Sequence, residues 1–281
     1  ASQAMDQMEM FKPVSKWQVR ITDPKSLDNI VDHAFRVATS GKPGPVVVCI
    51  PEDVAGADFE FRDPVIGRDG ATYPATRSAP DPDSVRQAVS ALGQAERPIL
   101  IVGGGAHISG AGEQVRELSE LLNIPVVTSI SGKGIIGEDY ANAFGVTGTF
   151  GSPVARDLVK QSDLVFFIGC KAGQLTTYSY RCPHRDTQII HLDNDSEEIS
   201  RNYANTIGLV ADARLGLEAL LVALAGKASS YRWDFDPPRA RYHVWYQENT
   251  DPEQEDNDPL KPPSIMGVVN QVLTDNDVVV C

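Results

Sequence analysis

Cysteine is scarce in this chain of 281 residues. The four cysteines, Cys49, Cys170, Cys182 and Cys281, are scattered and form no CxxC pair. This spacing argues against a disulfide framework and against a zinc site, and it favours buried, reduced thiols. The sequence also has no apolar run long enough to span a bilayer and no basic-then-apolar signal at its N-terminus, so we expect a cytoplasmic protein with no membrane partner.

Basic residues are too few to form an obvious patch. The formal net charge is -13, and between Asp234 and Asp258 eight acids stand against only Arg239 and Arg241. Nucleic acids and anionic membrane surfaces both require a basic surface, so neither is expected as a partner. Hydrophobic residues make up 42% of the chain, which is enough for a substantial core.

Several catalytic motifs are missing as well. The sequence contains no P-loop, no HExxH and no GxSxG. The strict dinucleotide fingerprint fails too, because Ile108 stands where a third glycine should follow Gly103 and Gly105, and the next predicted strand ends in Thr128 rather than in an acid. These absences disfavour an ordinary NAD dehydrogenase. We find no self-sufficient catalytic constellation in the chain and expect no metal site in it.

What is present is a β-α-β unit at residues 97–128. The apolar run Ile99–Val102 predicts a buried strand that stops at three glycines, residues 103–105, and apolar residues at helical spacing predict a helix from Gly112. A second short apolar run, Ile124–Thr128, completes the unit. Two interpretations are open: the glycines allow close helix packing, or they and a helix N-terminus hold a phosphate group.

Strands and helices alternate through residues 81–226. Six strands are expected there, which predicts a doubly wound α/β domain with a six-stranded parallel sheet. A short helix is expected from Ser196. Residues 63–80 and 227–262, rich in proline and charged residues, predict linkers.

Pieces of further α/β structure flank this domain. Residues 1–62 predict a strand, a helix that Asp23 and Pro24 begin, and a strand at Val46–Ile50 whose partner strands are not evident in the sequence. Residues 263–281 predict a helix and a terminal apolar strand. Because apolar strands of a parallel sheet have neighbours on both sides, we expect both flanking pieces to be incomplete α/β units.

In open parallel sheets, ligands bind beyond the carboxyl ends of the strands. The residues that follow the predicted strands are therefore candidates for binding a cofactor: Gly103, Gly104, Gly105, Thr128, Ser129, Ile130, Gly148, Gly169, Lys171, Asp193, Asn194 and Asp212. Glycines admit a phosphate closely, and acids accept hydrogen bonds from a ribose. Alternatively, Asp193, Asn194 and Asp212 cap the helices that follow them. His191, within a strand, is expected to be a hydrogen-bonded core residue.

An ordered series of segments resembles the thiamine diphosphate-dependent enzymes of the acetolactate synthase type. The segments are FKPVSKW, TSGKPGPVVVCIPEDV, RPILIVGGG, IPVVTSISGKG, DLVFFIGC, IIHLDNDSEEI and VADA. The resemblance implies the end of a pyrimidine-binding domain at 1–62, a whole central domain at 81–226 and the start of a diphosphate-binding domain at 263–281. It also implies that the catalytic glutamate and the magnesium and diphosphate motif lie outside these residues, so the fragment alone is expected to be inactive.

The resemblance carries further expectations about sites and partners. Gln3 matches a glutamine that borders the active site in many relatives, and Lys16 matches a lysine near the substrate entrance. The implied cofactors are thiamine diphosphate and Mg²⁺ in the intact enzyme, whose substrate is a small 2-oxo acid. The implied partners are the rest of the polypeptide and a second identical subunit in a homo-oligomer.

FAD or ADP binding by the central domain stays open. Relatives that hold FAD carry an Arg-Phe-Asp-Asp-Arg stretch, which here reads Lys171 to Leu175, KAGQL, without the arginines that pair with a pyrophosphate. Two other classes are also weighed. The chain could be a stand-alone nucleotide-binding or regulatory module, or an enzyme of the sirtuin or transhydrogenase kind, although the zinc cysteines and NAD signatures of the latter are missing.

Overall fold

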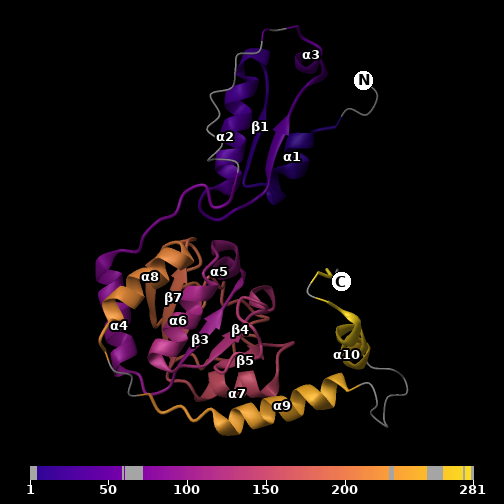
Figure 1. Ribbon diagram of the computed structural model, residues 1–281. Coiled ribbons are helices and arrows are strands. Elements are labelled where there is room, and N and C mark those ends of the chain that lie inside the picture. Colours follow the sequence, from indigo (N-terminus) through magenta and orange to yellow (C-terminus); the bar gives the residue numbers. More distant parts are fainter. Residues whose placement is uncertain are drawn as a thin grey trace.

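A computed structural model of the chain describes residues 5–58, 60, 72–227, 231–251, 262–274 and 276–279. A small N-terminal lobe is joined to a larger α/β domain by a connector that we define as residues 72–80 (Figure 1). Gln3 lies outside the described residues, as does Cys281.

The N-terminal lobe is built on a two-stranded parallel sheet. Its elements are α1 (Gln7–Phe11), the 3-10 helix η1 (Lys12–Val14), β1 (Trp17–Arg20), the 3-10 helix η2 (Pro24–Ser26), α2 (Leu27–Thr39), β2 (Val46–Cys49) and α3 (Glu52–Ala55). Asp23 caps η2 with Pro24 at its first turn, as predicted. The expectation that the strand at Val46 has no partner in the sequence was wrong, because β1 pairs with it from Trp17↔Val46 to Arg20↔Cys49.

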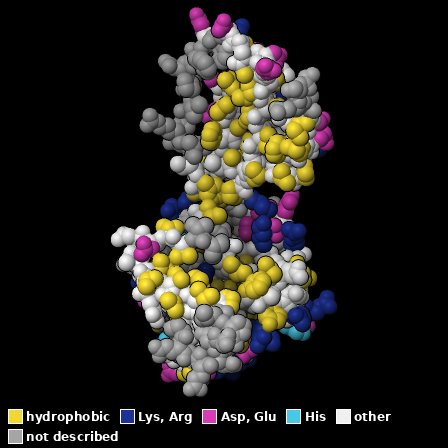
Figure 2. Space-filling view, turned by 90° about the vertical axis from the view of Figure 1, so that its right-hand side faces the viewer, with side chains coloured by type: hydrophobic (Ala, Val, Ile, Leu, Met, Phe, Trp, Pro, Cys, Tyr) yellow, Lys and Arg dark blue, Asp and Glu magenta, His cyan; other side chains and the backbone are white. Residues whose placement is uncertain are grey.

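Little of this lobe is fully buried. Both strands are only half-buried, and among the described residues of the lobe the buried apolar side chains are Ile21, Ala34 and Val54. Clusters of hydrophobic side chains are visible on its surface in Figure 2. The exposed large apolar residues of the lobe are Met5, Met10, Phe11, Val14, Phe35 and Ile50.

The larger domain contains a six-stranded, all-parallel sheet. Its elements are α4 (Pro82–Gln94), β3 (Pro98–Val102), α5 (Gly104–Ser109), α6 (Gly112–Leu122), β4 (Val126–Thr128), the 3-10 helix η4 (Ile130–Gly132), β5 (Ala143–Val146), α7 (Pro153–Gln161), β6 (Leu164–Ile168), β7 (Gln188–Asp193), β8 (Thr206–Val210) and α8 (Ala213–Leu224). The strand order is β5-β4-β3-β6-β7-β8. This is the doubly wound order, so the predicted fold class is confirmed.

Two apolar layers cover the sheet, one on each face. Alternate side chains of β3 divide between them, with Leu100 and Val102 in one layer and Ile99 and Ile101 in the other. Helices α4, α6 and α8 pack on the first layer, and α7 packs on the second. Strands β3 and β6 are buried along their whole length, which explains why their sequences are continuous apolar runs.

Some elements differ from the prediction. Helix α5 begins inside the glycine run, whereas the sequence predicted a helix only from Gly112. Residues after Ser196 form turns instead of the expected short helix. Near the C-terminal end, α10 (Pro262–Val272) forms as expected, but residues 277–279 form no strand. Within the described ranges, no helix is long and apolar enough to cross a membrane.

The segment predicted as a second linker contains a helix, α9 (Asp236–Thr250), that crosses below the domain in Figure 1. The residues before α9 fasten it to the domain, because Trp233 Nε1 donates to Pro98 O at 2.6 Å and Tyr231 Oη donates to Leu92 O at 2.9 Å. The ring of Tyr242 is buried against Gly145, where the space of a Cβ is taken by the Tyr242 ring and the φ angle is +71°. The absence of a side chain at Gly145 therefore leaves the room that the Tyr242 ring of α9 fills.

Candidate functional site

The candidate site lies where the strand order reverses. β3 and β6 are neighbours in the middle of the sheet, and the chain leaves them in opposite directions. At such a switch point a crevice opens outside the carboxyl ends of the strands. Those ends carry Gly103, Gly104 and Gly105 after β3 and Gly169 with Lys171 after β6.

The first cavity at this edge has a volume of about 610 Å³. It is lined by Gly103, Gly104, Gly105, Ile108, Ser129, Ile130, Ser131, Thr147, Gly169, Cys170, Lys171, Gly173, Gln174, Leu175 and Thr176. Seven of the twelve predicted cofactor-binding residues therefore meet here. The rim is apolar, since Ile108, Ile130 and Leu175 are each exposed over half of their surface. Lys171 is the cation that lines it.

The glycines of this cavity serve close packing. A Cβ on Gly103 would collide with the backbone of Gly169 and Cys170, and a Cβ on Gly105 would lie 2.9 Å from Gly169 O. Their N–H groups are also used inside the chain: Gly103 N donates to Ile168 O, and Gly105 N donates to Gly169 O, both at 2.9 Å. Ala106 N donates to Gly103 O, and α5 has only six residues. These groups therefore leave little free donor capacity for a phosphate.

A second, smaller cavity of about 210 Å³ adjoins the first along Gly105, Ile108, Gly169 and Lys171. Its lining comes from both lobes: Lys42, Pro43, Tyr73, Gly105, Ile108, Ser109, Gly169, Lys171, Asp193, Asn194, Asp195, Glu198, Ala211, Asp212 and Ala213. Three more predicted residues, Asp193, Asn194 and Asp212, meet here. The N-terminal lobe and the connector thus help to form the edge of the central sheet.

The acids after β7 and β8 have structural roles in the chain. Asp212 caps α8 by accepting from Leu215 N at 3.2 Å, as the capping alternative predicted. Asp193 accepts from Asp195 N at 3.0 Å, which forms a turn and not a helix start. Asn194 Nδ2 donates to Gly41 O in the N-terminal lobe at 2.9 Å.

Burial and pairing shift the pKa values of groups at this edge. Burial raises the pKa of the Asp193 carboxyl, and burial lowers the pKa of His191, whose Nε2 lies 2.8 Å from Cys170 O. The prediction that His191 is a hydrogen-bonded core residue is confirmed. The hydrogen bond from Lys42 lowers the pKa of Asp195, and the same bond raises the pKa of Lys42. The Lys42–Asp195 pair, at 2.6 Å, is therefore ionised at neutral pH.

The remaining predicted residues lie apart from these cavities. Thr128 and Gly148 line neither of them, and Gly148 packs against the backbone of Leu175 and Thr176 behind the first cavity. The ammonium of Lys16 donates to three carbonyl oxygens, Val37 O and Ser40 O at 2.6 Å and Lys42 O at 2.9 Å. Lys16 thus neutralises the carboxyl end of α2, and burial lowers its pKa.

Sequence reasoning did not name Lys42, Tyr73 and Ser109, which line the second cavity, or Arg77, which pairs with Asp212 beside it. Lys42 lies in a turn, with Gly41 before it and Pro43 and Gly44 after it. Ser109 ends a helix that the sequence did not predict. Tyr73 and Arg77 lie in an aperiodic segment. Only the position of Lys42 in the family-like segment TSGKPGP could have indicated it.

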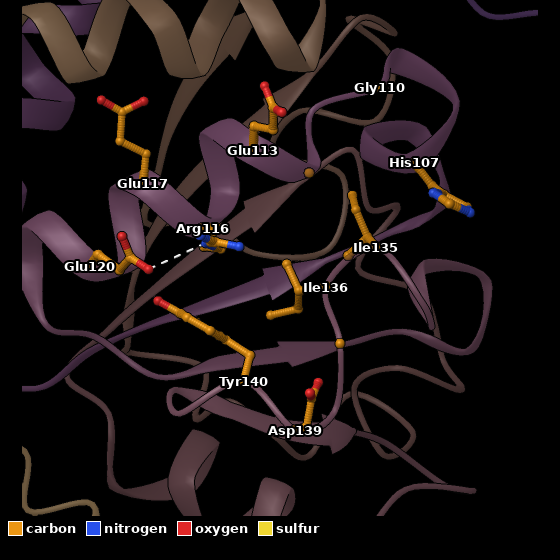
Figure 3. A pocket seen from close by; sticks show the side chains of 12 residues that line it. His107, Gly110, Glu113, Arg116, Glu117, Glu120, Ile135, Ile136, Asp139 and Tyr140 are labelled. Atoms are coloured by element: carbon orange, nitrogen blue, oxygen red, sulfur yellow. Dashed lines mark ion pairs between the residues drawn. The ribbon is translucent and has the colours of Figure 1, made fainter. Parts of the chain in front are cut away.

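A third cavity, of about 880 Å³, lies elsewhere, between α6 and residues 135–140 (Figure 3). The figure shows acidic side chains from α6 on one side, with Arg116 paired to Glu120, and Tyr140 with Asp139 on the other. The ion pair spans 3.3 Å and is largely exposed. This cavity holds none of the predicted site residues, and its four acids disfavour a phosphate or carboxylate ligand.

Comparison with known proteins shows which family the chain resembles. Residues 85–220 match the family model described as thiamine pyrophosphate enzyme, central domain. Over these residues and their flanks, the chain is similar to the thiamine diphosphate-dependent enzymes of the acetolactate synthase type. The resemblance found in the sequence is thereby confirmed.

Three relatives illustrate the match. The probable acetolactate synthase large subunit of Methanocaldococcus jannaschii is 33% identical over 225 residues, which cover 80% of this chain and 38% of the relative. The large subunit of Porphyra purpurea is 28% identical over 277 residues, or 98% of this chain and 47% of the relative. The acetolactate synthase large subunit of Corynebacterium glutamicum is 34% identical over 223 residues, which cover 79% of this chain and 35% of the relative. The chain spans less than half the length of these relatives.

Proposed function

We propose that this chain is a segment of a thiamine diphosphate-dependent 2-oxo acid decarboxylase or carboligase that resembles the acetolactate synthase large subunit. The observation that supports this most is the complete six-stranded parallel sheet over the residues that match the family's central domain. The flanking matches in relatives of more than twice its length support a multidomain enzyme.

The proposal keeps the domain boundaries given above. Residues 1–62 belong to a pyrimidine-binding domain, 81–226 form the central domain, and 263–281 begin a diphosphate-binding domain. Residues 63–80 and 227–262 connect them. A second identical subunit, a cytoplasmic location and a 2-oxo acid substrate are parts of the same proposal.

In the proposed enzyme, thiamine diphosphate with Mg²⁺ supplies the carbanion chemistry. No group of three or more His, Cys, Asp or Glu side chains that could hold a metal ion occurs among the described residues. The resemblance places the magnesium and diphosphate motif outside this chain, so no chemical step is assigned to the described residues. Gln3 and Lys16 are proposed to border the active site, where Lys16 orders the α2–β2 loop through its three carbonyl contacts.

The test uses the complete gene product that contains this segment. Purified with thiamine diphosphate and Mg²⁺, it is expected to release CO₂ from pyruvate or a related 2-oxo acid and to form acetolactate or another carboligation product. A matched preparation without the cofactor serves as the control. Absence of decarboxylation across a panel of 2-oxo acids, with thiamine diphosphate bound as measured by calorimetry, would contradict the proposal.

The alternative of a stand-alone nucleotide-binding or regulatory module has a different outcome in the same test. A gene product that ends near these residues and binds an adenine nucleotide without 2-oxo acid turnover would favour that alternative. The cavities at the carboxyl edge are the observation behind it.

A further inference from the structure

The connector reaches into the carboxyl edge of the central sheet. Its backbone is held there, since Asp212 N donates to Ser78 O at 3.0 Å. Two of its side chains, Tyr73 and Arg77, contact residues that follow β7 and β8. The connector is therefore part of the edge where a nucleotide would have to bind.

Arg77 and its neighbours occupy the hydrogen-bond acceptor positions of the Asp212 carboxylate. Its Nη1 lies 2.8 Å from Asp212 Oδ1, 2.9 Å from Asp212 Oδ2, 2.9 Å from Ser109 O and 3.0 Å from Ser109 Oγ. Ser109 Oγ in turn donates to Asp212 Oδ2 at 2.8 Å, and Leu215 N donates to Oδ1. Only 5% of the Asp212 surface is exposed, so the carboxylate has no position left for a ribose hydroxyl.

The neighbouring polar groups are also occupied from within the chain. Asn194 Nδ2 donates to Gly41 O at 2.9 Å and to Tyr73 Oη at 3.1 Å. Lys42 pairs with Asp195 at 2.6 Å and approaches the buried Glu198 at 3.5 Å. The edge of β7 and β8 is thus filled by side chains and backbone of the N-terminal lobe and connector.

The space that remains between the two lobes is small. The cavity between the lobes has a volume of about 210 Å³, whereas pockets for drug-sized ligands have volumes of roughly 300–1,000 Å³. The larger cavity next to it offers one cation, Lys171, and three of its glycine N–H groups, those of Gly103, Gly105 and Gly169, already donate to carbonyls. A pyrophosphate bound there would have few partners for its two charges.

We propose that the connector occupies the position at this edge where an adenine nucleotide would bind. The hydrogen-bonded cluster of Arg77, Asp212 and Ser109, which we call the latch, holds the connector there. The central domain of this chain therefore binds neither FAD nor ADP. The latch also fixes the N-terminal lobe to the carboxyl ends of β7 and β8. This inference does not depend on which reaction the intact enzyme catalyses.

The latch can be tested with trypsin, because the Arg77–Ser78 bond is itself a cleavage site. Cleavage of this bond in the folded chain requires release of Arg77 from Asp212, so it is expected to be slow. Asp212→Asn is expected to accelerate it about tenfold, since one partner of a largely buried pair is lost. Mass spectrometry follows the 77–78 cut, and each rate is divided by that of a synthetic peptide with the same residues 72–82.

Two further variants separate release of the latch from damage to α8. Arg77→Lys leaves the Asp212 cap of α8 intact and keeps a trypsin site, and it is expected to accelerate normalised cleavage severalfold. Glu218→Gln removes an acid from an exposed pair on the same helix and is expected to change the rate less than about twofold. Equal normalised rates for wild type, Asp212→Asn and Arg77→Lys would overturn the latch.

The nucleotide arm uses ADP and FAD as separate probes. With either at about 1 mM, titration calorimetry of the wild-type chain is expected to show no saturable heat, and the cleavage rate is expected to stay unchanged. Saturable binding of either probe, or slowing of the 77–78 cut by it, would overturn the assignment of the connector as the occupant.

Discussion

The docking of α9 gives the sharpest prediction about stability, because one helix carries a buried tyrosine and an exposed one at adjacent turns. Tyr242 is 8% exposed and belongs to the apolar layer beside α7, while Tyr246 is 40% exposed. Both rings come from the same helix and lie 6.5 Å apart. Replacing each by alanine therefore separates the effect of burial from that of helix propensity.

The expected magnitude follows from the area that Tyr242 buries. An aromatic side chain buries roughly 150 Å² or more, and at about 25 cal/mol per Å² this amounts to about 4 kcal/mol as an upper bound. Alanine retains a small part of that area, so Tyr242→Ala is expected to lower the free energy of unfolding by about 3 kcal/mol. Tyr246→Ala is expected to lower it by about 0.5 kcal/mol.

The hydroxyl of Tyr242 contributes little to this difference. Its Oη lies 3.5 Å from Glu138 Oε2, which is a long contact, and burial raises the pKa of the phenol so that it stays neutral. Tyr242→Phe is therefore expected to cost less than about 1 kcal/mol.

Urea unfolding followed by fluorescence and circular dichroism measures all three variants, and hydrogen exchange of residues 236–250 reports whether α9 detaches locally. Faster exchange in α9 for Tyr242→Ala, without the same effect in Tyr246→Ala, is the expected pattern. Equal losses of stability for the two alanine variants would refute the reasoning, because they would mean that α9 does not depend on the contact with Gly145.

Four other outcomes follow from the structure. Gly103→Ala should lower the free energy of unfolding by about 2 kcal/mol because its Cβ meets the Gly169 backbone, whereas Gly93→Ala, in open space on α4, should raise it by about 0.5 kcal/mol; thermal melts compare the two. Asp195→Asn should shift the urea midpoint more at pH 7 than at pH 3, because a depressed carboxyl pKa adds stability that is fully present above about pH 4 and is lost as the pH falls through the folded-state value; a shift of equal size at both pH values would contradict this. Lys16→Met should destabilise the N-terminal lobe by about 1 kcal/mol, seen as faster hydrogen exchange near Val37 and Ser40 and not in the central sheet. Cys49 should react with a thiol reagent before Cys170 and Cys182, whose pKa values burial raises to about 11; mass spectrometry of the labelled peptides decides the order.

The central sheet could be predicted in detail because its signals are local. β6 coincides with the apolar run between Asp163 and Gly169, and α4 begins at the Asp81 cap with Pro82 in its first turn. These features depend on a few neighbouring residues. The doubly wound fold class followed from the alternation of strands and helices.

The features that could not be predicted depend on contacts between distant residues. Arg77 and Asp212 are 135 positions apart, so no local pattern joins them. α9 was missed because its aromatic residues lie among charges and prolines and show no clear apolar period; its stability comes from packing on the domain. The helix expected after Ser196 does not form, and there Asp195 accepts from Glu197 N in a turn.

The central position of β3 has a consequence for how the domain is assembled during synthesis. β3, β4 and β5 are complete once residue 146 has emerged, and they can pair as a three-stranded unit with α6 on one face. The other edge of β3 stays unpaired until β6, which ends at residue 168, has been synthesised. A ribosome stalled between these two points would display an unpaired apolar strand edge, so this interval is where a nascent chain needs protection from aggregation.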